Sequence, residues 1–344
     1  MTTGKERVIA ALKRTCIDCI PATIMFGNSQ PGLAGMAMKD FLHDAAKRAQ
    51  CHLDVYEMFR PDTLGVSGPI FKEAMALGTE VEYLEDGASR VVKHLLEDKR
   101  DLAKLHIPDP KRNPSMSWYL EVLERVLKKV TEVPVAGTVA GPWTLAATLR
   151  GIEQLIMDTM EDPRFVHELL KFATEVEKVW GTAVREVGVG IGLGEAVASC
   201  YVISPKIYRE FIKPYHIDLN NYFKERKLYI SLHICGYIDP ILDDVLATGI
   251  SMFSIDAPTS LSRMVKLSQK KVVIMGNVPT MLFLQGTQRE MEAAVKECIA
   301  TAAKGGAFLL SSGCEIPANS KAELVHDFMK AARKWGSCEQ VAAL

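Results

Sequence analysis

Three residues of the chain have the types and the spacing of a metal site. His233 and Cys235 stand two positions apart after a short apolar run, and Cys314 follows a later run. Residues i and i+2 of an extended segment point the same way, so one metal ion can take both members of the first pair. One imidazole and two thiolates suit zinc, and three protein ligands leave a position open for substrate, as in catalytic zinc sites. The alternative is that these cysteines are small buried hydrophobic residues.

The elements that must position these residues are visible as an alternation of short apolar runs and longer amphipathic stretches. This alternation predicts parallel strands with covering helices. The predicted strands are 133–139, 189–193, 228–232, 251–255, 272–275 and 307–310. The predicted helices are 163–187, 204–227, 238–248, 281–304 and 320–335.

Polar residues with catalytic capability gather just past the carboxyl ends of these predicted strands. In a (β/α)8 barrel that face carries the active site. We therefore predict an α/β fold, a (β/α)8 TIM barrel, forming a single domain over residues 1–344. The first 130 residues or so would supply the early strands and additional N-terminal helices.

A glycine-rich run at 188–194 helps to decide between a barrel and an open, doubly wound sheet. Its glycines fall at every second residue, so the run does not match the phosphate-binding pattern G-x-G-x-x-G. A period of two is the period of a strand. One face of this predicted strand is therefore without side chains. That face makes room for a bulky group, although a tight packing contact explains it equally well.

Composition excludes several classes of protein. The chain has 344 residues, 48% of them hydrophobic, and its 41 basic and 42 acidic residues leave a net charge of -1. Such a chain is neither disordered nor fibrous, and it lacks the basic excess of a nucleic-acid binder. No apolar run has the length of a membrane helix, and the amino-terminal residues do not form a secretory signal. We expect a cytoplasmic protein whose eight cysteines, the Cys16-x-x-Cys19 pair included, are free thiols or metal ligands.

The region of the first two candidate ligands also carries a family resemblance. Residues 233–256, which begin His-Ile-Cys-Gly, strongly resemble the zinc site of the methylcobalamin:coenzyme M methyltransferases, within the uroporphyrinogen decarboxylase superfamily. The segment Gly-Cys-Glu-Ile-Pro at 313–317 is similar to their late cysteine segment. Weaker matches lie at 139–147, 195–199 and 203–215, so the resemblance spans most of residues 133–335.

The resemblance implies roles for individual residues. It implies a zinc ion held by His233, Cys235 and Cys314. Asp256 stands where the family often has Glu and would fill the fourth position, although its shorter side chain counts against direct ligation. Glu195 stands where relatives commonly carry Asp, and it would orient a ligand or accept a proton; an ion pair at the barrel mouth is the alternative.

Four other residues near the expected pocket are predicted to contact substrate or cofactor. They are Gly194, Trp143, Asn277 and Asp62. His216 lies in a predicted helix and is expected on its face. The oligomeric state is left open.

The activity that the resemblance implies is zinc-dependent transfer of a methyl group between a methylcobamide and a zinc-activated acceptor such as a thiol. The methylcobamide would be carried by a small partner corrinoid protein. The residues do not distinguish a thiol acceptor such as coenzyme M from a folate acceptor. One alternative is the reverse direction, in which a methoxy, methylamine-type or methylthiol compound methylates a cobalt(I) corrinoid protein.

Two further alternatives are weaker. Uroporphyrinogen decarboxylase itself needs no metal and grips the substrate carboxylates with an early arginine-rich segment, but residues 21–28 contain no arginine. A non-enzymatic corrinoid carrier would show an Asp-x-His-x-x-Gly motif, which the sequence lacks.

Overall fold

The computed structural model describes residues 2–84 and 87–343. The chain divides into two units, each assembled from segments that are distant in sequence. Unit 1 comprises Met1–Ser67, Arg125–Ala136 and Ser251–Leu344, and unit 2 comprises Gly68–Glu124 and Gly137–Ile250. Whether residues 1–344 act as a single domain stays a prediction.

Unit 2 holds the strands β4 (Val135–Ala140), β5 (Gly190–Glu195) and β6 (Ile230–Ile234), which are adjacent in that order. The first two residues of β4 belong to unit 1. The strands β2 (Glu80–Tyr83) and β3 (Ser89–Lys93) pair antiparallel as a separate sheet. The helices of this unit are α5 (Lys72–Leu77), α6 (Pro114–Leu127, ending in unit 1), α7 (Pro142–Arg150), α8 (Ile152–Glu161), α9 (Pro163–Glu186), α10 (Pro205–Ile207), α11 (Lys213–Glu225) and α12 (Leu242–Leu246), with 3-10 turns η2 (Lys99–Lys104) and η4 (Asp239–Ile241) and a π-helical turn η3 (Tyr208–Ile212).

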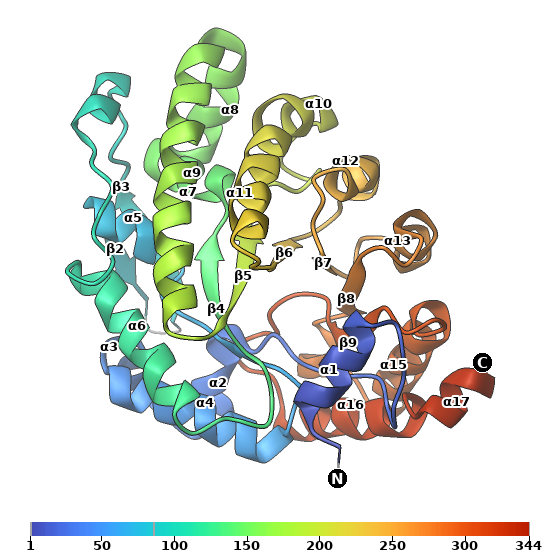
Figure 1. The fold of residues 1–344 in the computed structure, drawn as a ribbon. Coiled ribbons are helices and arrows are strands. Elements are labelled where there is room, and N and C mark those ends of the chain that lie inside the picture. Colours follow the sequence, from blue (N-terminus) through green and yellow to red (C-terminus); the bar gives the residue numbers. More distant parts are fainter. Residues whose placement is uncertain (1, 85–86, 344) are drawn as a thin grey trace. The chain divides into compact units, whose positions relative to one another are not determined.

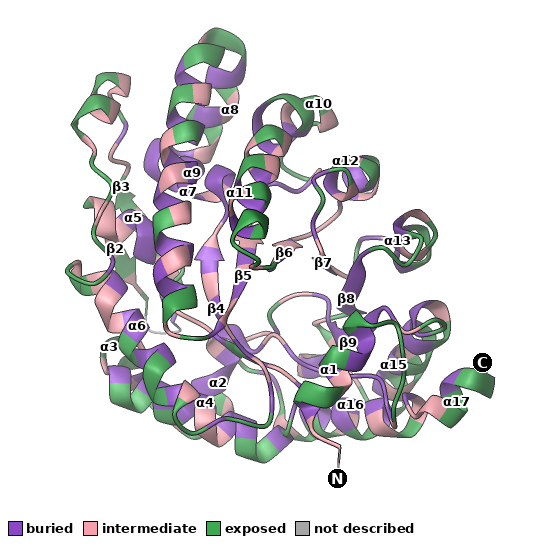
Figure 2. Ribbon diagram, in the orientation of Figure 1, coloured by how far each residue is buried: buried purple, intermediate pink, exposed green. Residues whose placement is uncertain are grey.

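Helix α9 illustrates why these segments are helical. The Asp162 side chain accepts a hydrogen bond from the Phe165 backbone N–H, and proline opens the first turn, so the helix start is capped. Apolar residues then recur at helical spacing and are buried, while the other face is exposed, as Figure 2 shows. The helix lies along β5 (Figure 1), with Trp180 fully buried in the packing of this unit.

Unit 1 holds β1 (Leu64–Val66) and the adjacent parallel strands β7 (Met252–Ile255), β8 (Val273–Val278) and β9 (Phe308–Ser312). Its helices are α1 (Gly4–Leu12), α2 (Gln30–Leu33), α3 (Met38–His43), α4 (Ala45–Phe59), α13 (Leu261–Ser268), α14 (Leu282–Gln285), α15 (Gln288–Ala302), α16 (Ala322–Trp335) and α17 (Cys338–Ala343), with a 3-10 turn η1 (Gly27–Ser29). The helices α1 to α4, all before β1, are the N-terminal helices that the sequence predicted.

An irregular segment around Ala22 takes the place of a regular strand beside β9. Ala22 forms a parallel bridge to Leu310, and the Leu310 N–H donates to the Pro21 carbonyl over 3.0 Å. On its other side the Ala22 carbonyl accepts from the Asp62 N–H at 2.7 Å. This segment is too short and irregular to be recognised from apolar periodicity, which explains why the sequence located no strand there.

All six predicted strands are present, but three predicted helices are interrupted or divided. The helix predicted over 238–248 consists of the 3-10 turn η4 followed by α12. The helix predicted over 281–304 breaks at Gly286, where α14 ends and Thr287 starts α15 with a capping box to Glu290. The helix predicted over 204–227 is divided into α10, η3 and α11. Pro214 in the first turn of α11 has no N–H to donate to the preceding turn. That turn, η3, is therefore not held in the α-helical form and is π-helical. Among residues 2–84 and 87–343, no helix is long and apolar enough to cross a membrane.

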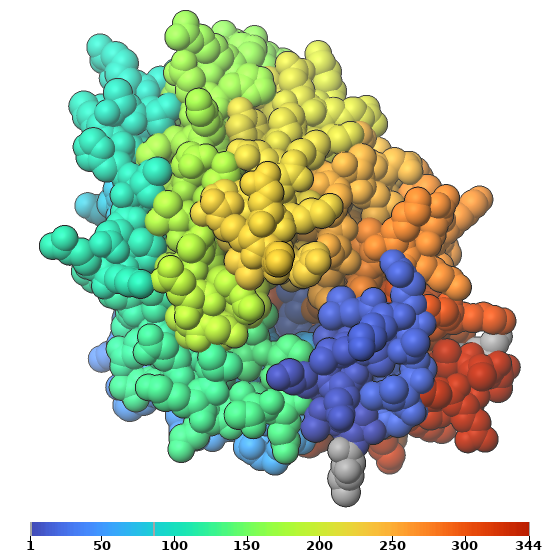
Figure 3. Space-filling view, viewed as in Figure 1, coloured from blue at the N-terminus to red at the C-terminus, as the bar shows by residue number. Residues whose placement is uncertain are grey.

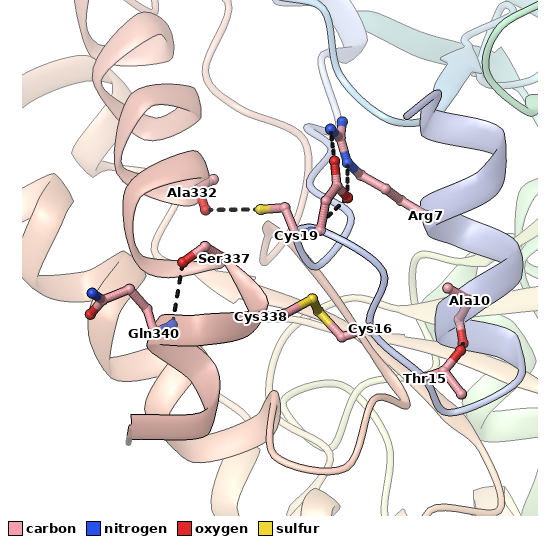
Figure 4. Close-up of a disulfide and its surroundings, with 10 residues drawn as sticks. Arg7, Ala10, Thr15, Cys16, Cys19, Ala332, Ser337, Cys338 and Gln340 are labelled. Atoms are coloured by element: carbon pink, nitrogen blue, oxygen red, sulfur yellow. Dashed lines mark hydrogen bonds and ion pairs between the residues drawn. A yellow bond between two sulfur atoms is a disulfide. The ribbon is translucent and has the colours of Figure 1, made fainter. Parts of the chain in front are cut away.

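A disulfide corrects the expectation that every cysteine is a free thiol or a ligand. Cys16 and Cys338 form a disulfide within unit 1 (Figure 4), and their sequence separation of 322 residues leaves no local pattern to reveal it. The segment that follows α1 is thus joined to the start of α17; these parts of the chain are blue and red in Figures 1 and 3. The nearby Cys19 is not bonded to Cys16; its thiol is buried against the Ala332 carbonyl, and burial raises its pKa.

Reduction of this disulfide is expected to lower the free energy of unfolding by about 2–4 kcal/mol, because the open chain gains conformational freedom when unfolded. Urea unfolding with and without dithiothreitol measures the change. Cys16→Ser is the control, since it has no disulfide to lose and should be insensitive to the reductant. Equal midpoints for the wild type and Cys16→Ser without reductant would contradict the prediction.

Candidate metal centre

Two of the predicted ligands meet at the carboxyl end of β6. His233 is the penultimate residue of β6, and Cys235 is the first residue after the strand. The strand therefore extends two residues beyond its predicted end. His233 Nε2 lies 3.4 Å from Cys235 Sγ. Zinc bonds of about 2.0 Å to nitrogen and 2.3 Å to sulfur at a tetrahedral angle would place these donors about 3.5 Å apart. The pair therefore fits the coordination of a single zinc ion.

The glycine-bearing face of β5 adjoins this pair. Gly194 pairs in register with His233, and Gly192 pairs with Ser231. A methyl group added at Gly192 would meet its neighbours at 3.6 Å or more, and one at Gly194 would meet only the Val139 carbonyl at 4.0 Å. The predicted strand with one bare face is thus confirmed, and there is room beside His233 that these glycines leave unfilled.

Cys314 lies in unit 1, two residues beyond the end of β9, and Asp256 lies next to it in the same unit. A Cβ added at the intervening Gly313 would stand 3.0 Å from Asp256 Oδ1 and 2.5 Å from the Ala257 backbone nitrogen. Gly313 also donates its N–H to the Val278 carbonyl at 2.8 Å. The absence of a side chain at Gly313 therefore allows the Asp256 carboxylate to lie beside the backbone that carries Cys314.

Asn277 holds the loop that carries Asp256. Its side-chain amide, 7% exposed, donates to the Asp256 carbonyl at 3.2 Å and to the Thr259 carbonyl at 2.9 Å. The Cys298 thiol donates to the Asn277 Oδ1 at 3.8 Å. These bonds position the backbone of residues 256–259. The predicted contact of Asn277 with a cofactor stays a prediction.

Glu195, the last residue of β5, is fully buried, and four hydrogen bonds occupy its carboxylate. Oε1 accepts from the Trp143 N–H at 3.1 Å, and Oε2 accepts from the Thr144 N–H at 2.9 Å and hydroxyl at 2.7 Å. The carboxylate thus caps the amino terminus of α7, where the helix dipole favours a negative charge. Gly141 has no side chain because a Cβ there would collide with the Glu195 carboxylate.

The fourth bond to Glu195 comes from His216, which lies in α11 as expected, on the buried face of the helix. His216 is 3% exposed, and its Nε2 lies 3.0 Å from Glu195 Oε1. Its Nδ1 lies 3.2 Å from the hydroxyl of Tyr208, whose pKa burial raises. No local spacing joins His216 to Glu195, which is 21 residues earlier. The one sequence signal was a polar side chain within an apolar helical stretch.

Trp143 and Asp62, both predicted to contact substrate or cofactor, are buried by protein. Trp143 lies in the first turn of α7 and is fully covered. Asp62 is 2% exposed and binds Arg7 at 2.9 Å and Arg333 at 2.6 Å, which joins α1 to α16 within unit 1. The structure therefore gives Asp62 a structural role in unit 1, and a contact with substrate stays a prediction for both residues.

A buried carboxyl group on α9 lies outside the predicted set. Both oxygens of Glu177 are buried without a hydrogen-bond partner among the described residues. Burial, reinforced by the charge of Glu73, raises the pKa of Glu177 well above its ordinary value of 4.5. Glu73 itself is paired with Lys72 at 3.0 Å and accepts from the Ala140 N–H at 3.1 Å. Glu177 is therefore held in its neutral form.

Glu177→Gln is expected to stabilise the protein, and increasingly so as the pH rises. Above pH 4.5 the folded Glu177 keeps a proton that the unfolded chain has lost, so stability falls with pH by up to about 1.4 kcal/mol per unit until the raised pKa is reached. Glutamine removes this dependence. Urea midpoints at pH 5 and pH 8 measure it, with the exposed Glu186→Gln as control; an equal difference from wild type at both pH values would refute the idea.

The fold and the family follow from comparison with known proteins. A structure described as a methyltransferase from Methanosarcina mazei aligns with a TM-score of 0.87 at 23% identity, covering 97% of this chain and 99% of that chain. The predicted fold class, a (β/α)8 TIM barrel of the uroporphyrinogen decarboxylase type, is confirmed. The family model described as uroporphyrinogen decarboxylase (URO-D) matches residues 3–335, and the chain belongs to this family.

Relatives within the family have more than one activity. "Methylcobamide:CoM methyltransferase MtbA" of Methanosarcina mazei is 24% identical over 342 residues, which is 97% of this chain and 98% of the relative. "Methylated-thiol--coenzyme M methyltransferase" of the same organism is 27% identical, over 59% of this chain and 53% of the relative. "Uroporphyrinogen decarboxylase" of Prochlorococcus marinus is 24% identical, over 81% of this chain and 80% of the relative.

Proposed function

We propose that this chain is a zinc-dependent methyltransferase that moves a methyl group between a methylcobamide and a small thiol. The observation that carries the proposal is the His233–Cys235 pair, whose donor atoms lie 3.4 Å apart at the end of β6. The similarity to the methylcobamide:CoM methyltransferase of Methanosarcina mazei over almost the whole length of both chains supports it.

Cys314 is the third ligand that we propose. Each of the three residues offers one ligand atom, a histidine nitrogen or a cysteine sulfur. In a barrel the carboxyl ends of all strands open on one face, and Cys314 follows β9 as Cys235 follows β6. The Asp256 carboxylate lies beside Gly313, the residue that precedes that ligand, and we propose it as an additional donor while no thiol is bound.

Bound zinc lowers the pKa of a thiol at its open position and so supplies a nucleophilic thiolate near neutral pH. The protein's own residues prepare the surroundings. Gly192 and Gly194 keep side chains away from the space beside His233. Glu195 fixes the end of β5 to α7, and Asn277 fixes the loop of Asp256. In the reaction a carbon–sulfur bond forms as the cobalt–carbon bond breaks, and the electron pair of the broken bond stays on cobalt as cobalt(I).

We infer that the methylcobamide is delivered by a small corrinoid protein, as the sequence comparison with methylcobamide-dependent relatives suggests. The reverse direction uses the same residues: a methylated thiol would give its methyl group to a cobalt(I) corrinoid, with the thiolate as leaving group. The similarity to the methylated-thiol--coenzyme M methyltransferase favours this as the second candidate.

The experiment is an anaerobic assay of the zinc-loaded protein with methylcobalamin and 2-mercaptoethanesulfonate, followed by the change in cobalamin absorbance. We expect thiol-dependent demethylation that disappears when zinc is removed and returns when it is restored. Methylation of cob(I)alamin by a methylated thiol measures the reverse direction. A protein that binds no zinc, or a zinc-loaded protein inactive in both directions, would overturn the proposal and bring decarboxylation of uroporphyrinogen to the front.

A further inference from the structure

An exposed aromatic surface adjoins the proposed zinc ligands in unit 2. Tyr201, in the loop that follows β5, is 70% exposed, and its neighbour Val202 is 43% exposed. Tyr237 follows β6 two residues after Cys235, and its ring centroid lies 5.8 Å from that of Tyr201 at an interplanar angle of 34°. We call Tyr201, Val202 and Tyr237 the aromatic rim.

Backbone hydrogen bonds hold the aromatic rim in place. The Cys200 N–H donates to the Tyr237 carbonyl at 2.9 Å, and the Ser199 hydroxyl donates to the same carbonyl at 3.3 Å. Tyr201 in turn donates its N–H to the Ser199 hydroxyl at 3.2 Å. Ser199 is 4% exposed, so these bonds are shielded from water. The loop after β5 is therefore fastened to the turn that carries Cys235, and Tyr201 is presented in a fixed place.

The Tyr201 ring also reaches the turn of the ligands itself. A Cβ added at Gly236 would lie 3.1 Å from Tyr201 Cδ2 and 2.7 Å from the Ser199 hydroxyl oxygen. Gly236 has a φ of +73°, which favours glycine in any case. The aromatic ring thus lies against the residue that follows Cys235, with most of its surface open.

We propose that the aromatic rim binds the corrin ring of the methylcobamide, with Tyr201 as its main contact. This inference rests on the proposed function, because the methyl group on cobalt must reach the thiol beside Cys235. The corrin is a flat macrocycle much wider than a metal ion, so its edge has to lie on side chains that surround the ligands. Flat conjugated rings stack in offset or tilted fashion on tyrosine, and Tyr201 offers a fixed and exposed ring at the required place.

The chain provides a matched control for this contact. Tyr229 is also 70% exposed, but it directly precedes β6, whereas Cys235 follows the carboxyl end of the same strand. Tyr201→Ala and Tyr229→Ala therefore remove the same ring with the same exposure, one beyond the carboxyl end of β5 and the other before the amino end of its parallel neighbour β6. Tyr201→Phe keeps the ring and removes only the hydroxyl.

The experiment measures the affinity of each zinc-loaded protein for free methylcobalamin by equilibrium dialysis. The zinc content of each protein is measured as well. Tyr201→Ala is expected to weaken binding about 3- to 10-fold, the effect of one aromatic stacking contact, with zinc unchanged. The KM for methylcobalamin should rise by the same factor and the KM for the thiol should not change. Tyr201→Phe and Tyr229→Ala should bind as the wild type does.

The remaining outcomes separate this inference from the proposed function. If Tyr201→Ala binds methylcobalamin as tightly as an active wild type, the corrin contact is wrong and the proposed function stands. If Tyr201→Ala keeps its affinity for free methylcobalamin but loses affinity for a methylated corrinoid protein, the aromatic rim is a protein-docking surface and the corrin contact is again wrong. If the wild type binds neither zinc nor methylcobalamin, both proposals fall.

Discussion

Cys235→Ser will lose its zinc and its methyl-transfer activity while keeping its fold. A serine hydroxyl does not supply the thiolate that zinc prefers, and His233 is then left without its partner at 3.4 Å. Loss of an outer partner of a metal ligand already costs about 10- to 100-fold in metal affinity, so loss of a ligand should cost more. Metal analysis of the purified protein, from about one zinc per chain to a small fraction of one, measures the effect.

Cys200→Ser is the matched control. Cys200 is a free, half-buried cysteine of the same unit, and burial raises the pKa of its thiol. It should retain zinc and activity. Cys314→Ser tests the third ligand separately: if Cys235→Ser loses zinc and Cys314→Ser keeps it at full affinity, the metal is held by other donors and the proposed three-ligand set is wrong. Circular dichroism of each variant shows whether the fold is kept.

The part of the site that the sequence predicted is the part encoded by local patterns. The spacing of His233 and Cys235 on an extended segment was sufficient to place their donor atoms together, because strand geometry repeats every two residues. The alternating glycines of β5 likewise predicted a strand with a bare face, which pairs with Ser231 and His233. The end of β7 was predicted correctly, whereas the other five strand ends were predicted too early, because the residues that follow an apolar run still belong to the hydrogen-bonded strand.

The features that the sequence did not reveal depend on contacts distant along the chain. The Cys16–Cys338 disulfide joins residues 322 positions apart, and nothing near either cysteine marks its partner. His216 was correctly assigned to a helix face, but only tertiary packing turns that face toward Glu195 and buries it. The irregular segment at Ala22 joins the sheet through a single bridge, which leaves no apolar periodicity to detect. Gly286, Thr287 and Glu290 have the residue types of a helix boundary. The helix prediction over 281–304 missed this boundary because it relied on apolar spacing alone.

These contacts also bear on the role of Glu195, predicted as a residue that orients a ligand or accepts a proton. All its oxygen lone pairs that face the protein are engaged, by the backbone of Trp143 and Thr144, by the Thr144 hydroxyl and by His216. A carboxylate so occupied and fully buried holds the backbone of α7 in place and presents no oxygen to solvent. We therefore assign Glu195 as a positioning residue that joins the end of β5 to α7, next to Gly194 and His233.

Glu195→Ala is expected to lower the free energy of unfolding by about 3–5 kcal/mol, because buried donors lose their charged partner. Glu195→Gln should lower it by a smaller amount, about 1–3 kcal/mol, since its amide NH2 replaces one of the two oxygens and then faces either the Trp143 N–H or the Thr144 N–H, while the remaining oxygen still accepts the other. Urea unfolding measures both changes. The exposed Glu124→Gln is the control and should unfold as the wild type does.

The kinetics of Glu195→Gln distinguish positioning from catalysis. A positioning role predicts that activity falls together with stability, that zinc is retained, and that the pH profile of the remaining activity keeps its shape, because no titrating group of the reaction has been removed. A catalytic base would give the opposite pattern: a variant as stable as the wild type whose kcat collapses and whose pH profile loses its acidic limb. Observation of that second pattern would return Glu195 to the reacting atoms and require its bonds to α7 to open during turnover.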